Sequence, residues 1–289
     1  MEYGAMKVIR AETLGFCMGV RRAVDTAYRE AASGGRVYTL GPLIHNPHVS
    51  AALARKGAAV LDGLELPADL RGAAVIIRAH GVTPELEAEI ARRGARIADA
   101  TCPKVKASQL KAKALAEAGY RIFLAGEKRH SEVIGIQGYA PECLIVGDPQ
   151  EAETAAEQLA AVARKTALIG QTTISPEEYQ RIAAGIQRHI PNLAVIDTVC
   201  NAVKDRQESL KSLCGKADAV LIAGGRESAN TRRLLRTAEA LGKPAWLAES
   251  LADIPADIAA YPIIGLSAGA STPDDLIDLI EEALTAMHA

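Results

Sequence analysis

The chain has 289 residues, of which 49% are hydrophobic and 24% are charged, and its formal net charge is −2. This composition is ordinary for a globular protein, and the near-neutral charge gives no basis for binding nucleic acid. No apolar stretch approaches the length of a membrane span, so we expect no membrane association. The start of the chain lacks the basic and apolar regions of a signal peptide. We therefore expect a cytoplasmic protein whose five cysteines are reduced rather than paired in disulfides.

One pattern occurs three times along the chain. In each copy a cysteine is followed by a helix, a strand and a polar loop that begins with glycine. A second strand then runs into a hydroxyl–proline–acid sequence that is typical of a helix start, with the hydroxyl residue as the expected N-cap. These sequences are Thr83-Pro84-Glu85, Ser175-Pro176-Glu177 and Thr272-Pro273-Asp274. Strands that alternate with helices predict parallel sheets in α/β layers. In chain order the expected elements are strand 6–10, helix 20–32, strands 36–40, 75–80 and 95–99, helix 104–118, strands 120–125, 167–173 and 194–197, helix 202–214, and strands 219–223 and 263–269.

The three cysteines that open the copies share one register. Counting 24 residues on from each cysteine reaches a glycine, and counting 28 reaches His45, His130 and Ser228. One unit used three times predicts a pseudo-threefold arrangement that brings three sulfurs to one axis. The fold class expected is therefore α/β, with three pseudo-threefold-related units and mostly parallel sheets. The expected boundaries are 1–17 for an N-terminal strand that completes the third unit, 18–102 for the first unit, 103–200 for the second and 201–289 for the third.

The three cysteines in register, Cys17, Cys102 and Cys200, are candidate metal ligands. Three thiolates without a close cysteine pair suit an iron–sulfur cluster better than zinc. A [4Fe–4S] cluster held by three cysteines would leave one iron open to a substrate. Cys143 and Cys214 fall outside the register and are interpreted as packing residues. Three buried core cysteines, a zinc hydrolase with three cysteine ligands, and a non-catalytic iron–sulfur sensor or electron carrier remain alternatives.

Several polar side chains follow the predicted strands at the end where the cysteines lie. In open α/β sheets this end forms the ligand crevice. Imidazole, hydroxyl and amide donors in equivalent loops suit a diphosphate, and Glu132 is either a proton donor or a surface carboxylate. No dinucleotide or ATP motif is present, so the electrons of a redox enzyme would come from another protein. The donors are His45, His80, His130, Thr172 or Thr173, Ser228, Asn230 and Ser271.

Taken together, these motifs resemble the family of 4-hydroxy-3-methylbut-2-enyl diphosphate reductases (LytB/IspH) over nearly the whole chain. The resemblance implies a trefoil of three α/β units around a [4Fe–4S] cluster held by Cys17, Cys102 and Cys200. It is carried by Gly15-Phe16-Cys17-Met18-Gly19-Val20, Ile44-His45-Asn46, Arg78-Ala79-His80-Gly81-Val82, Asp99-Ala100-Thr101-Cys102-Pro103, His130-Ser131-Glu132-Val133, Gln171-Thr172-Thr173, Asp197-Thr198-Val199-Cys200, Ser228-Ala229-Asn230 and Ala268-Gly269-Ala270-Ser271.

The resemblance also implies roles for the polar residues. Glu132, Thr172 and His130 would be catalytic, with Glu132 delivering protons and Thr172, favoured over Thr173, contacting the substrate hydroxyl. Two positions depart from the family pattern: Ala229 replaces a second serine, and Ser131 replaces a proline. The diphosphate would be bound by His45, His80, His130, Ser228, Asn230, Ser271 and the backbone of Ala229.

The implied activity is the reductive dehydroxylation of (E)-4-hydroxy-3-methylbut-2-enyl diphosphate. The products would be isopentenyl diphosphate and dimethylallyl diphosphate, and the reaction would be the final step of the methylerythritol phosphate route of isoprene biosynthesis. The implied electron donor is an external protein such as ferredoxin or flavodoxin.

Overall fold

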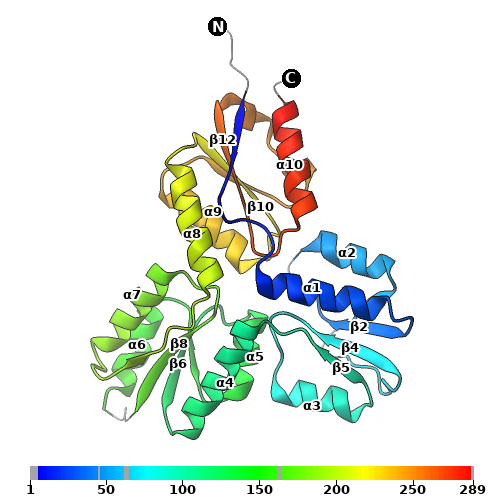
Figure 1. Ribbon diagram of the computed structural model, residues 1–289. Helices are drawn as coiled ribbons and strands as arrows, with labels where there is room; N and C mark the ends of the chain where they lie inside the picture. Colours follow the sequence, from blue (N-terminus) through cyan, green and yellow to red (C-terminus); the bar gives the residue numbers. More distant parts are fainter. Residues whose placement is uncertain (1–5, 45, 62–64, 162–164, 288–289) are drawn as a thin grey trace. The chain divides into compact units, whose positions relative to one another are not determined.

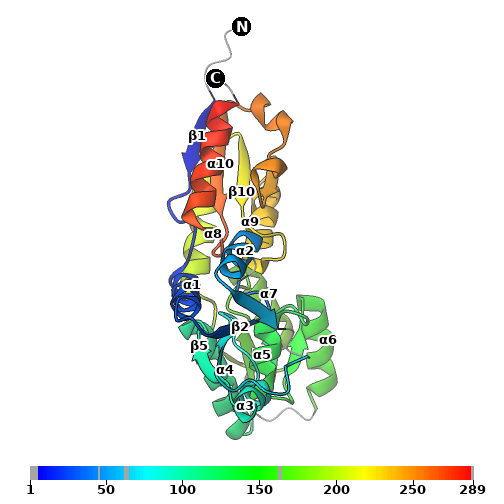
Figure 2. The same ribbon diagram turned by 90° about the vertical axis from the view of Figure 1, so that its right-hand side faces the viewer.

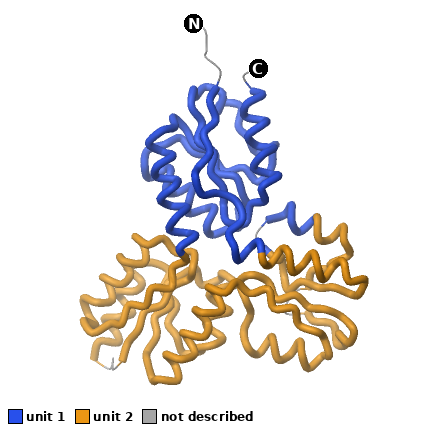
Figure 3. Tube along the Cα trace, viewed as in Figure 1, with its two compact units in different colours: residues 1–21, 44–51, 201–289 blue, residues 22–43, 52–200 orange. Residues whose placement is uncertain are grey.

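A computed structural model describes residues 6–44, 46–61, 65–161 and 165–287 of the chain. The chain forms two compact units, which Figure 3 shows in different colours. Unit 1 comprises residues 1–21, 44–51 and 201–289, and unit 2 comprises residues 22–43 and 52–200. Unit 1 contains one parallel sheet and unit 2 contains two. The boundaries expected at the three cysteines remain a prediction.

The three sheets have four parallel strands each and share one strand order. Read from the edge strand that precedes a cysteine, the orders are β1-β12-β10-β11, β5-β4-β2-β3 and β9-β8-β6-β7. The strands are β1 (Lys7–Arg10), β2 (Arg36–Leu40), β3 (Ala58–Leu61), β4 (Ala73–Ile77), β5 (Arg96–Asp99), β6 (Arg121–Ala125), β7 (Leu144–Val146), β8 (Thr166–Gly170), β9 (Ala194–Val195), β10 (Ala219–Ala223), β11 (Ala245–Ala248) and β12 (Ile263–Ala268).

Helices cover the faces of these sheets (Figure 1). They are α1 (Met18–Ala31), α2 (Pro47–Arg55), α3 (Pro84–Arg92), α4 (Pro103–Glu117), α5 (Ser131–Tyr139), α6 (Pro149–Leu159), α7 (Pro176–Gln187), α8 (Asn201–Cys214), α9 (Ala229–Ala240) and α10 (Asp274–Ala286), with the short 3₁₀ helices η1 (Leu251–Asp253) and η2 (Ala256–Ala260). No helix among the described residues is long and apolar enough to cross a membrane.

The sheet of unit 1 is covered by helices on both faces. Successive residues of its strand β10 point to opposite faces, so each contacts a different set of helices. Leu221 of β10 packs with Ile277 and Ile280 of α10. The next residue, Ile222, packs on the other face with Leu210 of α8 and Leu234 of α9. In both views of the ribbon α10 lies alongside this sheet (Figures 1 and 2).

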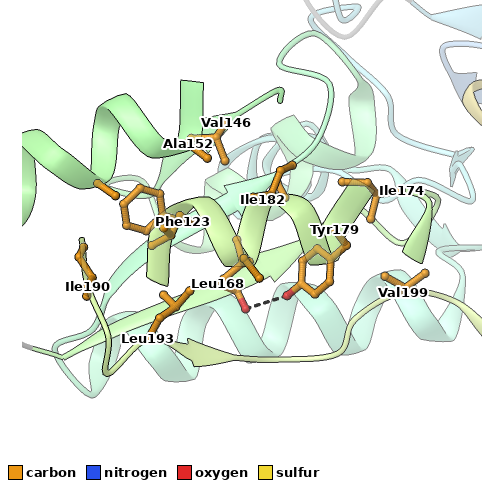
Figure 4. Close-up of a cluster of buried hydrophobic side chains, with 14 residues drawn as sticks. Phe123, Val146, Ala152, Leu168, Ile174, Tyr179, Ile182, Ile190, Leu193 and Val199 are labelled. Carbon is orange, nitrogen blue, oxygen red and sulfur yellow. Dashed lines mark hydrogen bonds between the residues drawn. The ribbon is translucent and has the colours of Figure 1, made fainter. Parts of the chain in front are cut away.

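The β6–β8 sheet of unit 2 has the same double burial. Phe123 and Leu168 pack against α6 and α7, while their neighbours Leu124 and Ile169 face α4 and α5. The close-up in Figure 4 shows the first of these clusters, in which the Tyr179 hydroxyl donates a hydrogen bond of 2.9 Å to the carbonyl of Leu168. Buried strands on both faces hold the strand ends, and therefore the loops that follow them, in fixed positions.

The prediction of α/β units with parallel sheets is confirmed. Strand β1 pairs with β12 and so belongs to the sheet of the third repeat, as the sequence indicates. The fourth strand of each sheet, namely β3, β7 or β11, is not among the strands predicted from the sequence. One predicted helix cap is wrong: Pro273, not Thr272, precedes α10, because the Thr272 hydroxyl donates to the carbonyl of Ala223 at 2.9 Å.

Candidate functional site

The backbone holds each of the three cysteines in the same way. Each cysteine N–H donates to the carbonyl of the residue two positions beyond the end of a strand, and these strands occupy equivalent places in the three sheets. The repeat seen in the sequence is therefore a repeat of hydrogen bonding. The three pairs are Cys17 with Ala270 at 3.2 Å, Cys102 with Ala79 at 2.9 Å, and Cys200 with Thr172 at 2.9 Å.

Each of these cysteines directly precedes a helix, namely α1, α4 or α8. The N-terminus of a helix carries partial positive charge, which favours a thiolate or another anion. None of the three helices has an acidic residue in its first turn, whereas α3, α6, α7 and α10 all do. The first turns of α1, α4 and α8 therefore contain no carboxylate that would repel an anionic group at the cysteines.

The donor set fits an iron–sulfur cluster. The three thiols are half-buried, and the five cysteines form no disulfide. Cys17 belongs to unit 1, and Cys102 and Cys200 belong to unit 2. Over the described ranges, no three His, Cys, Asp or Glu side chains are grouped as a metal site. The convergence of the three sulfurs therefore remains a prediction, supported by the shared backbone anchors.

Cys143 and Cys214 differ from the other three cysteines. Both are buried within hydrophobic clusters. Burial raises the pKa of the Cys143 thiol to about 11 and also raises the pKa of Cys214. Thiols in such surroundings are poor nucleophiles and ligands, so the structure supports their interpretation as packing residues.

Glu132, the one acid among the candidate residues, is buried, with 1% of its surface exposed. Its Oε1 accepts a hydrogen bond of 2.6 Å from the backbone N–H of Thr172. The carbonyl of Thr172 in turn accepts from the N–H of Cys200. One residue thus connects the buried carboxyl group to a candidate cluster ligand, and the surface-carboxylate alternative for Glu132 is wrong.

His130 forms the N-cap of α5. Its Nδ1 accepts from the N–H of Glu132 at 3.2 Å, so in the neutral ring the proton is assigned to Nε2, which can donate to an anion. The ring of His80 lies against it edge-on, with the centroids 5.2 Å apart and the planes at 88°. The structure therefore brings His80 and His130 together beside Glu132, within unit 2.

Gln171, which had no predicted role, connects two segments of unit 2 through its side-chain amide. Its side chain is fully buried; Oε1 accepts from the N–H of Glu127 at 3.0 Å, and Nε2 donates to the hydroxyl of Thr173 at 2.9 Å. A Cβ at Gly126 would lie 2.8 Å from the Cβ of Gln171, so only glycine fits there. Because the Thr173 hydroxyl accepts from Gln171, the neighbouring Thr172 is the better candidate for substrate contact.

Arg78 is a second residue without an assigned role in the sequence analysis. It follows β4, and its guanidinium lies against Gly41, where a Cβ would come within 2.6 Å of Nη1. Its Nε is buried without a hydrogen-bond partner among the described residues, and burial lowers the pKa of the side chain. A cation in such surroundings adds positive potential at the carboxyl end of this sheet.

The remaining polar candidates lie in unit 1, at the N-termini of α9 and α10. Ser228 forms the N-cap of α9, where its hydroxyl accepts from the N–H of Thr231 at 3.3 Å. Asn230 is 3% exposed, and neither atom of its amide has a hydrogen-bond partner in the described part of the chain. An unpartnered buried amide costs about 1–3 kcal/mol, which a ligand with acceptor oxygens would recover. Ala229 and Ser271 are buried beside these helix starts.

His45 lies outside the described residues, so the structure does not test its role. Its neighbour Asn46 caps α2 by accepting from the N–H of Val49 at 3.2 Å. The α2 and α9 helices also lack acidic residues in their first turns. A cavity of about 590 Å³ adjoins Tyr120, Cys143 and Lys165 at the amino end of β6, and none of the candidate residues lines it.

Three parallel four-stranded sheets, each with a cysteine hydrogen-bonded just beyond the carboxyl end of a strand, define the class: an α/β protein built from three similar units. The family described as "LytB protein" matches residues 8–285. The chain belongs to this family.

Named relatives agree with this assignment. The 4-hydroxy-3-methylbut-2-enyl diphosphate reductase of Treponema denticola is 45% identical over 96% of this chain and 99% of its own length. The enzyme of the same name from Desulfovibrio desulfuricans is 38% identical over 98% of this chain and its whole length.

Solved structures of reductases have the same fold. The Plasmodium falciparum E-1-hydroxy-2-methyl-but-2-enyl-4-diphosphate reductase superposes with a TM-score of 0.88 at 27% identity, covering 97% of this chain and 88% of that one. A second structure, described as (E)-4-hydroxy-3-methyl-but-2-enyl diphosphate reductase, the terminal enzyme of the non-mevalonate pathway, gives 0.70 at 36% identity, covering 97% and 99%.

Proposed function

We propose that this chain catalyses the reductive dehydroxylation of (E)-4-hydroxy-3-methylbut-2-enyl diphosphate to isopentenyl and dimethylallyl diphosphate, the terminal step of the non-mevalonate pathway. Family membership and near-complete coverage of the named reductases support this proposal. The observation within the chain that carries it is the link from buried Glu132 through Thr172 to Cys200. A proton donor beside a cluster ligand is what a reductive loss of water requires.

The proposed cofactor is a [4Fe–4S] cluster with Cys17, Cys102 and Cys200 as its ligands. Such a cluster supplies one electron at a time and, with three cysteines, an iron open to the substrate oxygen. The half-buried thiols and the carboxylate-free first turns of α1, α4 and α8 support this assignment. The electrons come from an external donor protein such as ferredoxin or flavodoxin, and reduced cysteines fit a cytoplasmic location.

The proposed diphosphate site includes two helix N-cap residues, His130 and Ser228. His130 presents Nε2–H because Nδ1 is occupied by the N–H of Glu132. Asn230 presents an amide with no partner among the described residues, and Ser228 lies at the same helix start. His45, His80, Ser271 and the backbone of Ala229 complete the proposed set.

Glu132 is the proposed proton donor to the departing hydroxyl group and to the carbon skeleton. Its burial excludes bulk water from the carboxyl group, and the Thr172 N–H fixes one of its oxygens. Thr172 is proposed to bind the substrate hydroxyl, since the Thr173 hydroxyl already accepts from Gln171. A sensor or electron carrier would need neither this acid nor the unpartnered amide of Asn230.

The proposal is tested by purifying and reconstituting the full chain without oxygen. We expect about four irons per chain and conversion of the hydroxylated diphosphate to both products when a chemical reductant and a viologen mediator are supplied. A zinc-containing protein, or an iron–sulfur protein that does not turn over this substrate, would contradict the proposal.

A further inference from the structure

Two arginines reach the segments that lead into the candidate cluster cysteines. Each arginine lies five or six residues after one cysteine of the repeat, on the helix which that cysteine precedes. Each donates to a backbone carbonyl just before the next cysteine in the cyclic order Cys200, Cys17, Cys102. Neither arginine has a role in the proposed chemistry.

Arg206 of α8 is one of the few buried charged residues, with 3% of its surface exposed. Its Nη2 donates to the carbonyl of Gly15 at 2.5 Å, and its Nη1 donates to the carbonyl of Ala202 at 2.8 Å. Gly15 lies two residues before Cys17, and Ala202 lies two residues after Cys200. One guanidinium therefore ties the segment before Cys17 to the first turn of α8. The single ammonium group of lysine cannot reproduce this pair of hydrogen bonds.

The turn that contains Gly15 requires glycine at that position. Gly15 has φ +75°, and a Cβ there would lie 2.8 Å from Oδ1 of Asp274 and 3.2 Å from Cδ1 of Ile277. Glycine is required for this backbone but leaves it flexible in the absence of other restraints. The hydrogen bond from Arg206 supplies such a restraint, two residues from a candidate ligand.

Arg22 of α1 makes the corresponding contact in unit 2. Its Nη1 donates to the carbonyl of Thr101 at 2.9 Å and its Nη2 to that of Asp99 at 3.3 Å. Thr101 is the residue before Cys102. The remaining copy has no such arginine, because α4 carries Ala107 and Ser108 at the corresponding positions. The segment before Cys200 is held instead by the Thr198 hydroxyl, which accepts from the N–H of Gly170 and donates to its carbonyl, both at 2.8 Å.

We propose that Arg206 and Arg22 are positioning residues that fix the segments leading into Cys17 and Cys102 for cluster binding. They do not contact the reacting atoms; they limit the motion of the ligands and so slow the release of iron. This inference rests on the cysteine-ligated cluster of the proposed function. It concerns how firmly the chain holds that cluster, not the reaction itself.

The test measures iron retention in the reconstituted full chain, without oxygen and without substrate. Arg206→Gln and Arg22→Gln are mixed with a ferrous chelator, and the rate of iron release is compared with that of the unchanged protein, together with the electron paramagnetic resonance signal of the reduced cluster. Because a hydrogen bond from a charged donor is lost, we expect release to be about tenfold faster. Arg206→Lys should give an intermediate rate.

Two control variants separate positioning from general stability. Arg233→Gln removes a second buried arginine of unit 1, and Arg29→Gln removes an exposed arginine of α1 whose side chain contacts Thr26. Thermal unfolding of the cluster-free proteins gives the stability of each variant. The exposed Arg22 provides a test even if Arg206→Gln does not fold.

The proposal is supported if Arg206→Gln and Arg22→Gln lose iron faster than the control variants at matched stability. It is overturned if both variants retain iron like the unchanged protein, or if Arg233→Gln loses iron as fast as Arg206→Gln. If the unchanged protein assembles no cluster, the proposed cofactor fails first and this inference fails with it.

Discussion

The carboxylate of Glu132 accepts a 2.6 Å hydrogen bond from the backbone N–H of Thr172, a residue whose carbonyl accepts from Cys200. The contact uses the backbone of Thr172 and leaves its side-chain hydroxyl to other interactions. It joins two residues that are 40 positions apart in the sequence. The loop after β6 and the loop after β8 meet because these strands are neighbours in one sheet.

The first prediction concerns Glu132. In Glu132→Gln the amide oxygen can still accept from Thr172, so the loop geometry and cluster content should be unchanged, but the acidic proton is lost. General acid catalysis is worth about 10²–10⁴ in rate, and we expect turnover to fall by this factor. Turnover is measured without oxygen, with a reduced viologen. The exposed Glu142→Gln is the control, and near-normal turnover of Glu132→Gln would assign the proton to another group.

The second prediction separates the two adjacent threonines. Thr173→Val removes the acceptor of the Gln171 amide and leaves a buried donor unsatisfied, which should lower the free energy of unfolding by about 1–3 kcal/mol. Thr172→Val should leave stability nearly unchanged and lower turnover. Denaturant unfolding and steady-state kinetics of both variants check this. The opposite result, a stable Thr173→Val with little activity, would make Thr173 the substrate contact.

The third prediction uses the unpartnered amide of Asn230. Because neither amide atom is hydrogen-bonded in the described part of the chain, Asn230→Ala should unfold at the same temperature as the unchanged protein or a higher one. The same variant should bind the diphosphate more weakly by about 0.5–1.5 kcal/mol, the net value of a neutral hydrogen bond. Calorimetry with substrate measures the affinity, and the exposed Asn192→Ala is the control. Unchanged affinity would place Asn230 outside the binding site.

Much of the fold could be predicted because its signals are local. The cysteine register, the buried apolar strands and the hydroxyl–proline helix starts at Thr83 and Ser175 are properties of short segments, and the structure confirms both caps. The edge strands β3, β7 and β11 are apolar but only three or four residues long, so their pairing depends on the neighbouring strand more than on their own sequence.

The site was less predictable than the fold because it depends on contacts between distant segments. The sequence identified Glu132 and Thr172 but not the hydrogen bond between them. It gave no role to Gln171, whose amide joins Glu127 to Thr173, or to Arg206, which resembles any helix-surface arginine until its burial is known. A charged side chain between apolar helix positions is a signal that could have indicated Arg206, whereas Gln171 follows β8 outside any helix and has no such signal.

The last prediction distinguishes the five thiols by their reactivity. Burial raises the pKa of Cys143 to about 11. The thiolate is the reactive form, so at pH 8 only about one Cys143 in a thousand is reactive, and its labelling should increase as the pH approaches 11. Cys214 is buried in the same manner and its pKa is also raised. Cys17, Cys102 and Cys200 are half-buried at helix N-termini, so iodoacetamide should modify them first in the folded, cluster-free protein.

Mass spectrometry of peptides from protein labelled for increasing times at pH 8 measures the five rates. In denaturant all five cysteines should react alike, because the differences arise from burial in the folded state. After anaerobic reconstitution the three cysteines of the repeat should become protected, while Cys143 and Cys214 remain as slow as before. Rapid modification of Cys143 in the folded protein would contradict its role as a packing residue. Continued labelling of Cys17, Cys102 or Cys200 after iron is incorporated would remove that residue from the ligand set.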